Sequence, residues 1–115
     1  MLFGGRRRDI LIGGLGGDEL YGDTGLTGSA PRASDDIMLG DNGELLYADA
    51  SIAANFGRLT LIRTTDTIET TGDADTAIGS DGDDVILGGV NNGGIDLLSG
   101  DDGADVVLGD NGELN

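Results

Sequence analysis

Aspartates recur at a short, regular spacing in the second half of the chain. Asp66, Asp75 and Asp84 follow one another at nine-residue intervals, and Asp96 and Asp105 continue the series after 12 and nine residues. From residue 79 onward these aspartates lie in segments rich in glycine, aspartate and asparagine. Such segments can supply carboxylate and backbone carbonyl oxygens, which are the ligands that calcium prefers. The residue types and their spacing therefore predict calcium-binding loops.

The charge of the chain favours the same ion. Its 115 residues include 22 acidic residues, six arginines and no lysine, which gives a formal net charge of −16, and 23 residues are glycine. This composition alone would favour disorder, because the carboxylates repel one another and the glycines are costly to order. Apolar residues follow the aspartates, however, and argue for a folded chain whose carboxylates are neutralised. About eight Ca²⁺ ions would cancel the formal charge.

The absence of histidine and cysteine excludes several classes of site. Zinc sites, disulfides and thiol chemistry depend on these residues, and histidine is also the commonest general base. The acidic charge disfavours nucleic acid as a partner. No apolar stretch approaches the roughly 20 residues that span a bilayer, so no membrane insertion is expected.

The aspartates must be positioned by a short repeating element. A nine-residue period is too short for a helix pair or a domain, and it instead describes one turn and one strand of a solenoid. In each unit the residue two positions after the aspartate is apolar and is expected to point into the core. These residues are Leu11, Leu20, Met38, Ile68, Ala77, Ile86, Leu98 and Val107.

One unit matches a known repeat in full. Residues 13–21 read GGLGGDELY, which fits the pattern G-G-x-G-x-D-x-U-x with U apolar. This nonapeptide resembles that of the repeats-in-toxin (RTX, hemolysin-type calcium-binding) family. The resemblance implies an all-β fold, a right-handed parallel β-roll or β-solenoid, in which several Ca²⁺ ions bind to the loops of successive coils. It also implies secretion and an extracellular or cell-surface location.

The resemblance further implies which residues bind calcium. Aspartates at the sixth position of the repeat would each close a site: Asp18, Asp36, Asp66, Asp75, Asp84, Asp96 and Asp105. Other loop aspartates are second candidates: Asp41, Asp81, Asp83, Asp101, Asp102 and Asp110. Loop glycines would present backbone carbonyls: Gly13, Gly14, Gly16, Gly79, Gly82, Gly88, Gly100 and Gly103.

Neighbouring coils would bring the sixth-position aspartates together in pairs. If one coil holds two nonapeptides, alternate units share an edge of the roll. The expected neighbours are then Asp18 with Asp36, Asp66 with Asp84, Asp84 with Asp105, and Asp75 with Asp96. Three arginines, residues 6–8, fill the loop before Asp9, so a calcium ion is not expected there. We expect these arginines to contact a carboxylate-rich neighbour.

The chain divides into three parts on this basis. Residues 1–44 and 61–115 are two β-roll segments, and residues 45–60 are an irregular or β insert. The sequence GDNGEL, which we call the GDNGEL box, occurs at residues 40–45 and again at 109–114. The offset of 69 residues indicates a longer repeat that contains the shorter ones.

The expected strands are apolar on both faces. Residues beside the inward position, such as Ile10, Ile12, Val106 and Leu108, are apolar although period-2 alternation would make them polar. Strands of this kind are normally buried on both faces. Either the insert or another molecule must cover the outer face, and we expect another molecule because the insert is short. The chain is therefore expected to form a homo-oligomer or filament through this face and the open ends of the solenoid.

Two functions fit these features. The first is a calcium-stabilised extracellular structural module, either a repeat of a secreted adhesin or surface protein or a fibre subunit that stacks end to end. The second is the calcium-binding C-terminal repeat segment of a type I-secreted enzyme or toxin, whose catalytic residues would precede the repeats. Asp23-Thr24-Gly25 is the tripeptide of aspartic proteases, but it lacks the preceding apolar strand and lies in register with a calcium loop. We therefore expect no enzymatic activity in these residues.

Overall fold

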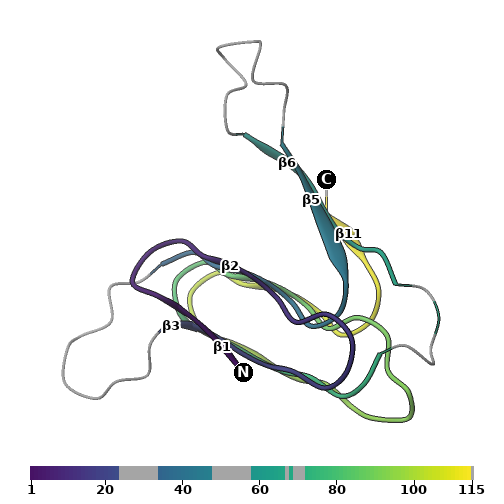
Figure 1. Cartoon of the computed structure of the whole chain (residues 1–115). Helices are drawn as coiled ribbons and strands as arrows, with labels where there is room; N and C mark the ends of the chain where they lie inside the picture. The colour runs from purple at the N-terminus through teal and green to yellow at the C-terminus, as the bar shows by residue number, and fades with distance from the viewer. Residues whose placement is uncertain (24–33, 48–57, 67, 69–71, 115) are drawn as a thin grey trace.

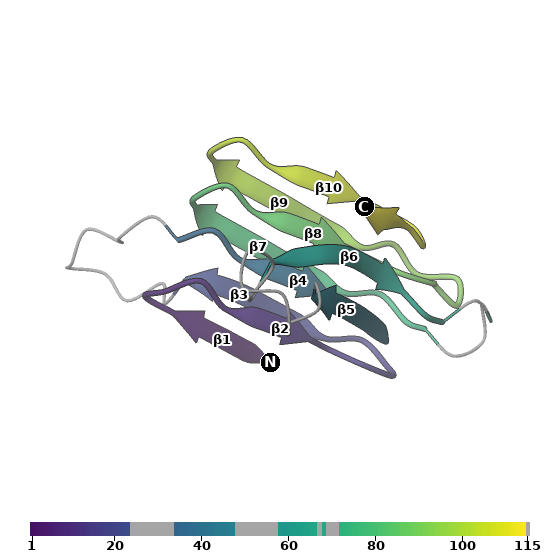
Figure 2. The same cartoon turned by 90° about the horizontal axis from the view of Figure 1, so that it is seen from above.

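The chain coils through two parallel β-sheets. The computed structural model describes residues 1–23, 34–47, 58–66, 68 and 72–114. Sheet 1 has the order β1 (Leu2–Gly5), β3 (Glu19–Asp23), β7 (Thr76–Asp81) and β9 (Leu97–Asp102). Sheet 2 has the order β2 (Ile10–Ile12), β4 (Ile37–Leu39), β8 (Val85–Leu87) and β10 (Val106–Leu108). Each coil holds one strand of each sheet, and the coils lie side by side as a parallel β-roll (Figures 1 and 2).

The core between the sheets consists of the apolar residues two positions after the loop aspartates. At most 6% of each of these side chains is exposed, and they form one cluster with Leu98 packed against it: Leu11, Leu20, Met38, Ala77 and Ile86. The inward direction is thus confirmed for these residues. Val107 aligns with Ile86 but is 43% exposed because it lies in the last coil. The prediction is wrong for Ile68, which is 59% exposed and lies outside every described strand.

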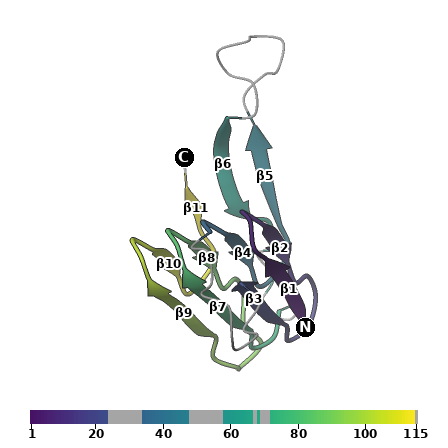
Figure 3. The ribbon, with the colours of Figure 1, turned by 90° about the vertical axis from the view of Figure 1, so that its left-hand side faces the viewer.

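A third sheet is antiparallel and is built from the two GDNGEL boxes. Its order is β11 (Glu113–Leu114), β6 (Leu59–Thr64) and β5 (Gly43–Tyr47), so β6 lies between two strands of the same sequence. Glu44 and Glu113 both pair in register with Arg63, and the next residue of each box pairs with Ile62. Figure 3 shows β5 and β6 extending away from the roll, with β11 beside them. The 69-residue offset is therefore also a structural repeat.

This third sheet covers much of the outer face of sheet 2. Ile62 forms a second apolar cluster with Ile37, Leu39 and Leu87. Further side chains from both sheets pack against this cluster: Leu45, Leu59, Val85, Leu108 and Leu114. The expectation that another molecule covers this face is therefore wrong for the central coils, because the hairpin around the insert covers them. Ile10, Ile12 and Val106 stay 39–46% exposed.

The path between β3 and β4 changes the predicted register of the coils. Leu20 and Met38 face each other within one coil although 18 residues separate them, where other coils use nine. Residues 24–33, which include Thr24 and Gly25, lie outside the described residues. In the part of the chain that the structure describes, no helix is long and apolar enough to cross a membrane.

Candidate calcium-binding loops

The loop aspartates form two rows, one along each edge of the roll. Loops that lead from sheet 1 to sheet 2 make the first edge and end in Asp9, Asp36, Asp84 and Asp105. Loops that lead from sheet 2 back to sheet 1 make the second edge and end in Asp18, Asp75 and Asp96. Since the strands are in parallel register, equivalent loops of successive coils stack directly on one another.

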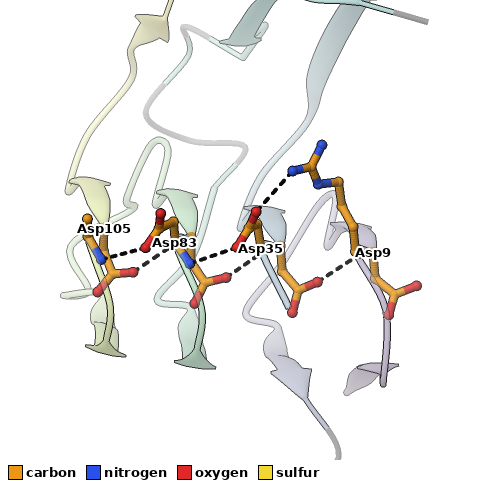
Figure 4. A network of polar contacts seen from close by, with 8 residues as sticks. Asp9, Asp35, Asp83 and Asp105 are labelled. Atoms are coloured by element: carbon orange, nitrogen blue, oxygen red, sulfur yellow. Dashed lines mark hydrogen bonds and ion pairs between the residues drawn. The ribbon is translucent and has the colours of Figure 1, made fainter. Parts of the chain in front are cut away.

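Backbone hydrogen bonds connect the aspartates within each row. On the first edge the N–H of Asp36 donates to Oδ1 of Asp84 at 2.7 Å, and Asp9 and Asp84 donate in the same way to the next coil at 2.8 and 3.0 Å (Figure 4). On the second edge Asp18 donates to Asp75 at 2.7 Å, and Asp75 donates to Asp96 at 3.0 Å. One oxygen of each accepting carboxylate is thereby satisfied.

The second oxygen of three of these carboxylates is buried without a partner. Asp36, Asp75 and Asp84 are each 1% exposed, and their Oδ2 atoms have no hydrogen bond among the described residues. A buried carboxylate that lacks a partner for one oxygen is costly unless it is protonated or bound to a cation. These oxygens are therefore the strongest sign of a missing ligand at the loops.

The loop glycines bring backbone carbonyls next to these oxygens. A Cβ built on Gly22 would lie 2.5 Å from Asp36 Oδ2 and 2.6 Å from the carbonyl oxygen of Gly79 in the next coil. On the second edge, a Cβ on Gly40 would collide with Asp75 Oδ2 and lie 2.5 Å from the carbonyl oxygen of Gly88. Only glycine leaves room for a carboxylate and a carbonyl to approach each other so closely.

Burial also changes the protonation of these groups. It raises the pKa of Asp36 and of Asp75 to about 6, and neighbouring carboxylates add to the effect although a backbone N–H opposes it. The pKa of Asp84 is raised for the same reason. The folded chain thus holds carboxyl groups whose charge is unfavourable in the absence of a cation.

The donor set fits calcium better than a metal bound by side chains alone. Among the described residues no three acidic side chains gather at one point, so each site would combine one carboxylate oxygen with carbonyl oxygens of stacked loops. Calcium takes six to eight such oxygens at flexible geometry. When bound, it would neutralise the row of carboxylates and tie one coil to the next.

The structure keeps two of the predicted aspartate pairs and rejects the other two. Asp84 lies beside Asp105, and Asp75 lies beside Asp96. Asp18 and Asp36 lie on opposite edges because of the long path between β3 and β4. Asp66 does not join Asp84: it accepts a hydrogen bond from Asn42 Nδ2 at 2.7 Å and lies near the second edge.

The other predicted glycines and aspartates occupy distinct places in the loops. Positive φ values of +91° to +150° are found at Gly14, Gly16, Gly82 and Gly103. A loop carboxylate lies where a Cβ would be at Gly13, Gly79, Gly88 and Gly100. Asp81 and Asp102 pair in register at the ends of β7 and β9. Asp101 adopts φ of +71° where the loop of residues 13–18 has Gly14.

A second, outer row of contacts on the first edge was not predicted. The N–H of Asp83 donates to Asp35 Oδ1 at 3.1 Å, and Ala104 donates to Asp83 Oδ1 at 2.9 Å (Figure 4). Arg8 Nη2 begins this row with an ion pair to Asp35 Oδ2 at 3.0 Å. The arginines were expected to contact a carboxylate-rich neighbour, and for Arg8 this neighbour is the next coil of the same chain. The only sign in the sequence was that Asp35 and Asp83 each directly precede a loop aspartate.

Comparison with known families agrees with this geometry. A family model described as the RTX calcium-binding nonapeptide repeat (4 copies) matches residues 1–25, 63–95 and 92–113, about two thirds of the chain. Comparisons with curated proteins and with solved structures gave no significant match. The repeat is a calcium-binding, non-catalytic module that is typical of type I-secreted extracellular proteins. On the matched repeats, the parallel β-roll and the two rows of loop aspartates, this chain belongs to the RTX calcium-binding repeat family.

Proposed function

We propose that this chain is a calcium-folded structural module of an extracellular protein, either a repeat of a secreted adhesin or surface protein or a fibre subunit. The observation that carries the proposal is the set of buried, unpaired oxygens of Asp36, Asp75 and Asp84. Without a cation these groups oppose folding, and with calcium they connect the coils. Metal binding and folding would then be one event.

Secretion gives this coupling a purpose. Calcium sites of extracellular modules have dissociation constants of about 0.1–1 mM, so they stay empty where calcium is scarce. A chain with a formal charge of −16 would remain unfolded there and fold after export. The chain would then serve as a spacer or as a contact module outside the cell.

End-to-end contact between copies is supported by the distribution of charge. All six arginines lie in residues 1–64 beside nine acidic residues, whereas residues 65–115 hold 13 acidic residues and no basic one. Coil 1, with its three arginines, could thus approach the acidic coil 4 of a second copy. Exposed Ile10 and Val106 lie on the outer strands of sheet 2 at these two ends.

Sedimentation velocity of the 115-residue chain, in excess EGTA and then in millimolar Ca²⁺, tests both parts of the proposal. We expect a slow, expanded species in EGTA. A compact monomer in calcium supports a spacer and contradicts the fibre. Large, fast species in calcium support the fibre subunit. A sedimentation coefficient that calcium does not change contradicts the proposal as a whole.

A further inference from the structure

Asp41 is a buried carboxylate that the nonapeptide repeat does not explain. It lies in the first GDNGEL box, within residues 26–62, which the family model does not match. It occupies the second loop position, where the loop of residues 13–18 has Gly14. Its exposed fraction is 0%, and neither Oδ1 nor Oδ2 has a hydrogen-bond partner among the described residues. Both carboxylate oxygens are thus available to a ligand inside the protein.

The next coil and the returning chain enclose this carboxylate. The N–H of Asp41 donates to the carbonyl oxygen of Gly88 at 3.2 Å, which fixes the backbone against the loop of residues 88–96. A Cβ on Gly89, whose φ is +109°, would lie 2.5 Å from Asp41 Oδ2, and a Cβ on Gly72 would lie 2.6 Å from the same atom. The position of Gly72 also adjoins the carbonyl oxygen of Val90. Side-chain and backbone oxygens therefore meet at this point.

A second unpaired oxygen is buried in the same loop. Asn91 Oδ1 has no hydrogen bond among the described residues, while Nδ2 of the same side chain donates to Asp96 Oδ2 at 3.0 Å. That contact fixes the orientation of the amide and leaves its oxygen without a donor. Asp96 is in turn close enough to Asp41 to raise its pKa, as are Asp66 and Asp18, in addition to the larger effect of burial. The N–H of Val90 favours the charged form of Asp41 but makes no hydrogen bond of ordinary geometry with it.

We propose that Asp41 forms an additional Ca²⁺ site together with the side-chain oxygen of Asn91 and the carbonyl oxygen of Val90. All three donors are oxygens, which calcium prefers and which zinc or copper would not select. The site differs from the repeat sites because its carboxylate comes from the second loop position and not from the sixth. It would fasten the base of the hairpin to coil 3. The inference rests on the proposed calcium-dependent folding and adds one ion to it.

The second GDNGEL box provides a matched control for the test. Asp110 stands at the same position of its box as Asp41, but it is exposed and no described loop lies over it. Calcium bound per chain would be counted by equilibrium dialysis in millimolar CaCl₂ for the wild type, D41N and D110N. We expect D41N to lose one ion per chain and D110N to match the wild type. An unchanged count in a folded D41N overturns the proposal.

A second variant covers the case in which D41N does not fold. N91A removes the amide oxygen but no charge, and circular dichroism in calcium would verify its fold. We expect the weakest class of sites in N91A to lose at least about tenfold in affinity, with the other classes unchanged. Identical binding by N91A and the wild type overturns the additional site. A wild type that binds no calcium contradicts instead the proposed function on which the site rests.

Discussion

At Asp36 and Asp75 the two oxygens of one carboxylate have opposite environments. Oδ1 accepts a backbone hydrogen bond from the preceding coil, whereas Oδ2 is buried without a partner among the described residues. In the calcium-free chain a proton can satisfy the buried oxygen, which is why the pKa of each group rises to about 6. Proton and calcium thus compete for the same atoms.

This competition predicts an effect of pH on the calcium-free chain. A carboxyl whose pKa is higher in the folded than in the unfolded state stabilises the fold at low pH, and this stabilisation is lost as the pH rises through about 6. Lowering the pH from about 7.5 to 5 in calcium-free buffer should therefore increase the β-sheet signal in far-UV circular dichroism. D36N should respond less than the wild type. A calcium-free chain that loses β-structure on acidification contradicts this assignment.

Backbone conformation at the second loop position gives another prediction at the residue scale. Ser80 has φ of +84°, a left-handed conformation that costs about 1–2 kcal/mol for residues other than glycine. S80G should relieve this strain and, after the entropy cost of glycine, raise the stability of the calcium-bound chain by about 0.5–1 kcal/mol. Thermal unfolding in calcium would measure the change. The control is S99G, since Ser99 lies in β9 and is not among the residues with positive φ. A loss of stability in both variants would contradict the prediction.

At the scale of elements, the hairpin of β5 and β6 is part of the core. Ile62 is 6% exposed and packs on Leu39 and Leu87 of sheet 2. I62A should therefore cost about 2–4 kcal/mol in calcium, as is usual for large-to-small changes in a packed core. I10A changes the same residue type on the same face, where 46% of the side chain is exposed, and should cost less than about 1 kcal/mol.

Chemical denaturation of the two variants in calcium would measure these costs. Equal losses for I62A and I10A would mean that another molecule covers the outer face at Ile10. That result would restore the cover by a second molecule that the sequence suggested for the whole face.

The repeated elements could be predicted from the sequence because their signal is local. Loop aspartates, glycines and the inward apolar residues recur within nine residues, and the core at Leu11, Leu20 and Ile86 follows from that period. The arrangement of the coils could not be predicted in the same way. A path of 18 residues between Leu20 and Met38 spans two nine-residue periods, so spacing alone placed Asp18 and Asp36 on one edge. Which edge a loop occupies depends on pairing between distant strands, and spacing does not encode it.

The candidate site shows the same limit. The types of the ligands followed from local composition, whereas their partners depend on packing between coils. Asp66 continues the nine-residue series before Asp75, yet the hairpin holds it beside Asn42. The burial of Asp41 arises from a glycine two coils away by sequence, Gly89, which no local pattern indicates.

At the scale of the whole molecule, a formal charge of −16 on 115 residues must be balanced before the coils can stack. The two rows of aspartates place this charge along the edges of the roll, where one cation can serve two coils. Folding should therefore need calcium as such and not merely ionic strength. Magnesium is a poor substitute because it demands near-ideal octahedral geometry and gives up its waters reluctantly.

A calcium titration followed by far-UV circular dichroism at pH 7.5 tests this claim most directly. The account predicts a spectrum of a disordered chain in chelator, and a cooperative change to β-structure at calcium concentrations of about 0.1–1 mM. Magnesium at the same concentrations should leave the spectrum unchanged. A β-sheet spectrum that is the same in chelator and in calcium, or that magnesium induces equally well, would contradict calcium-driven folding.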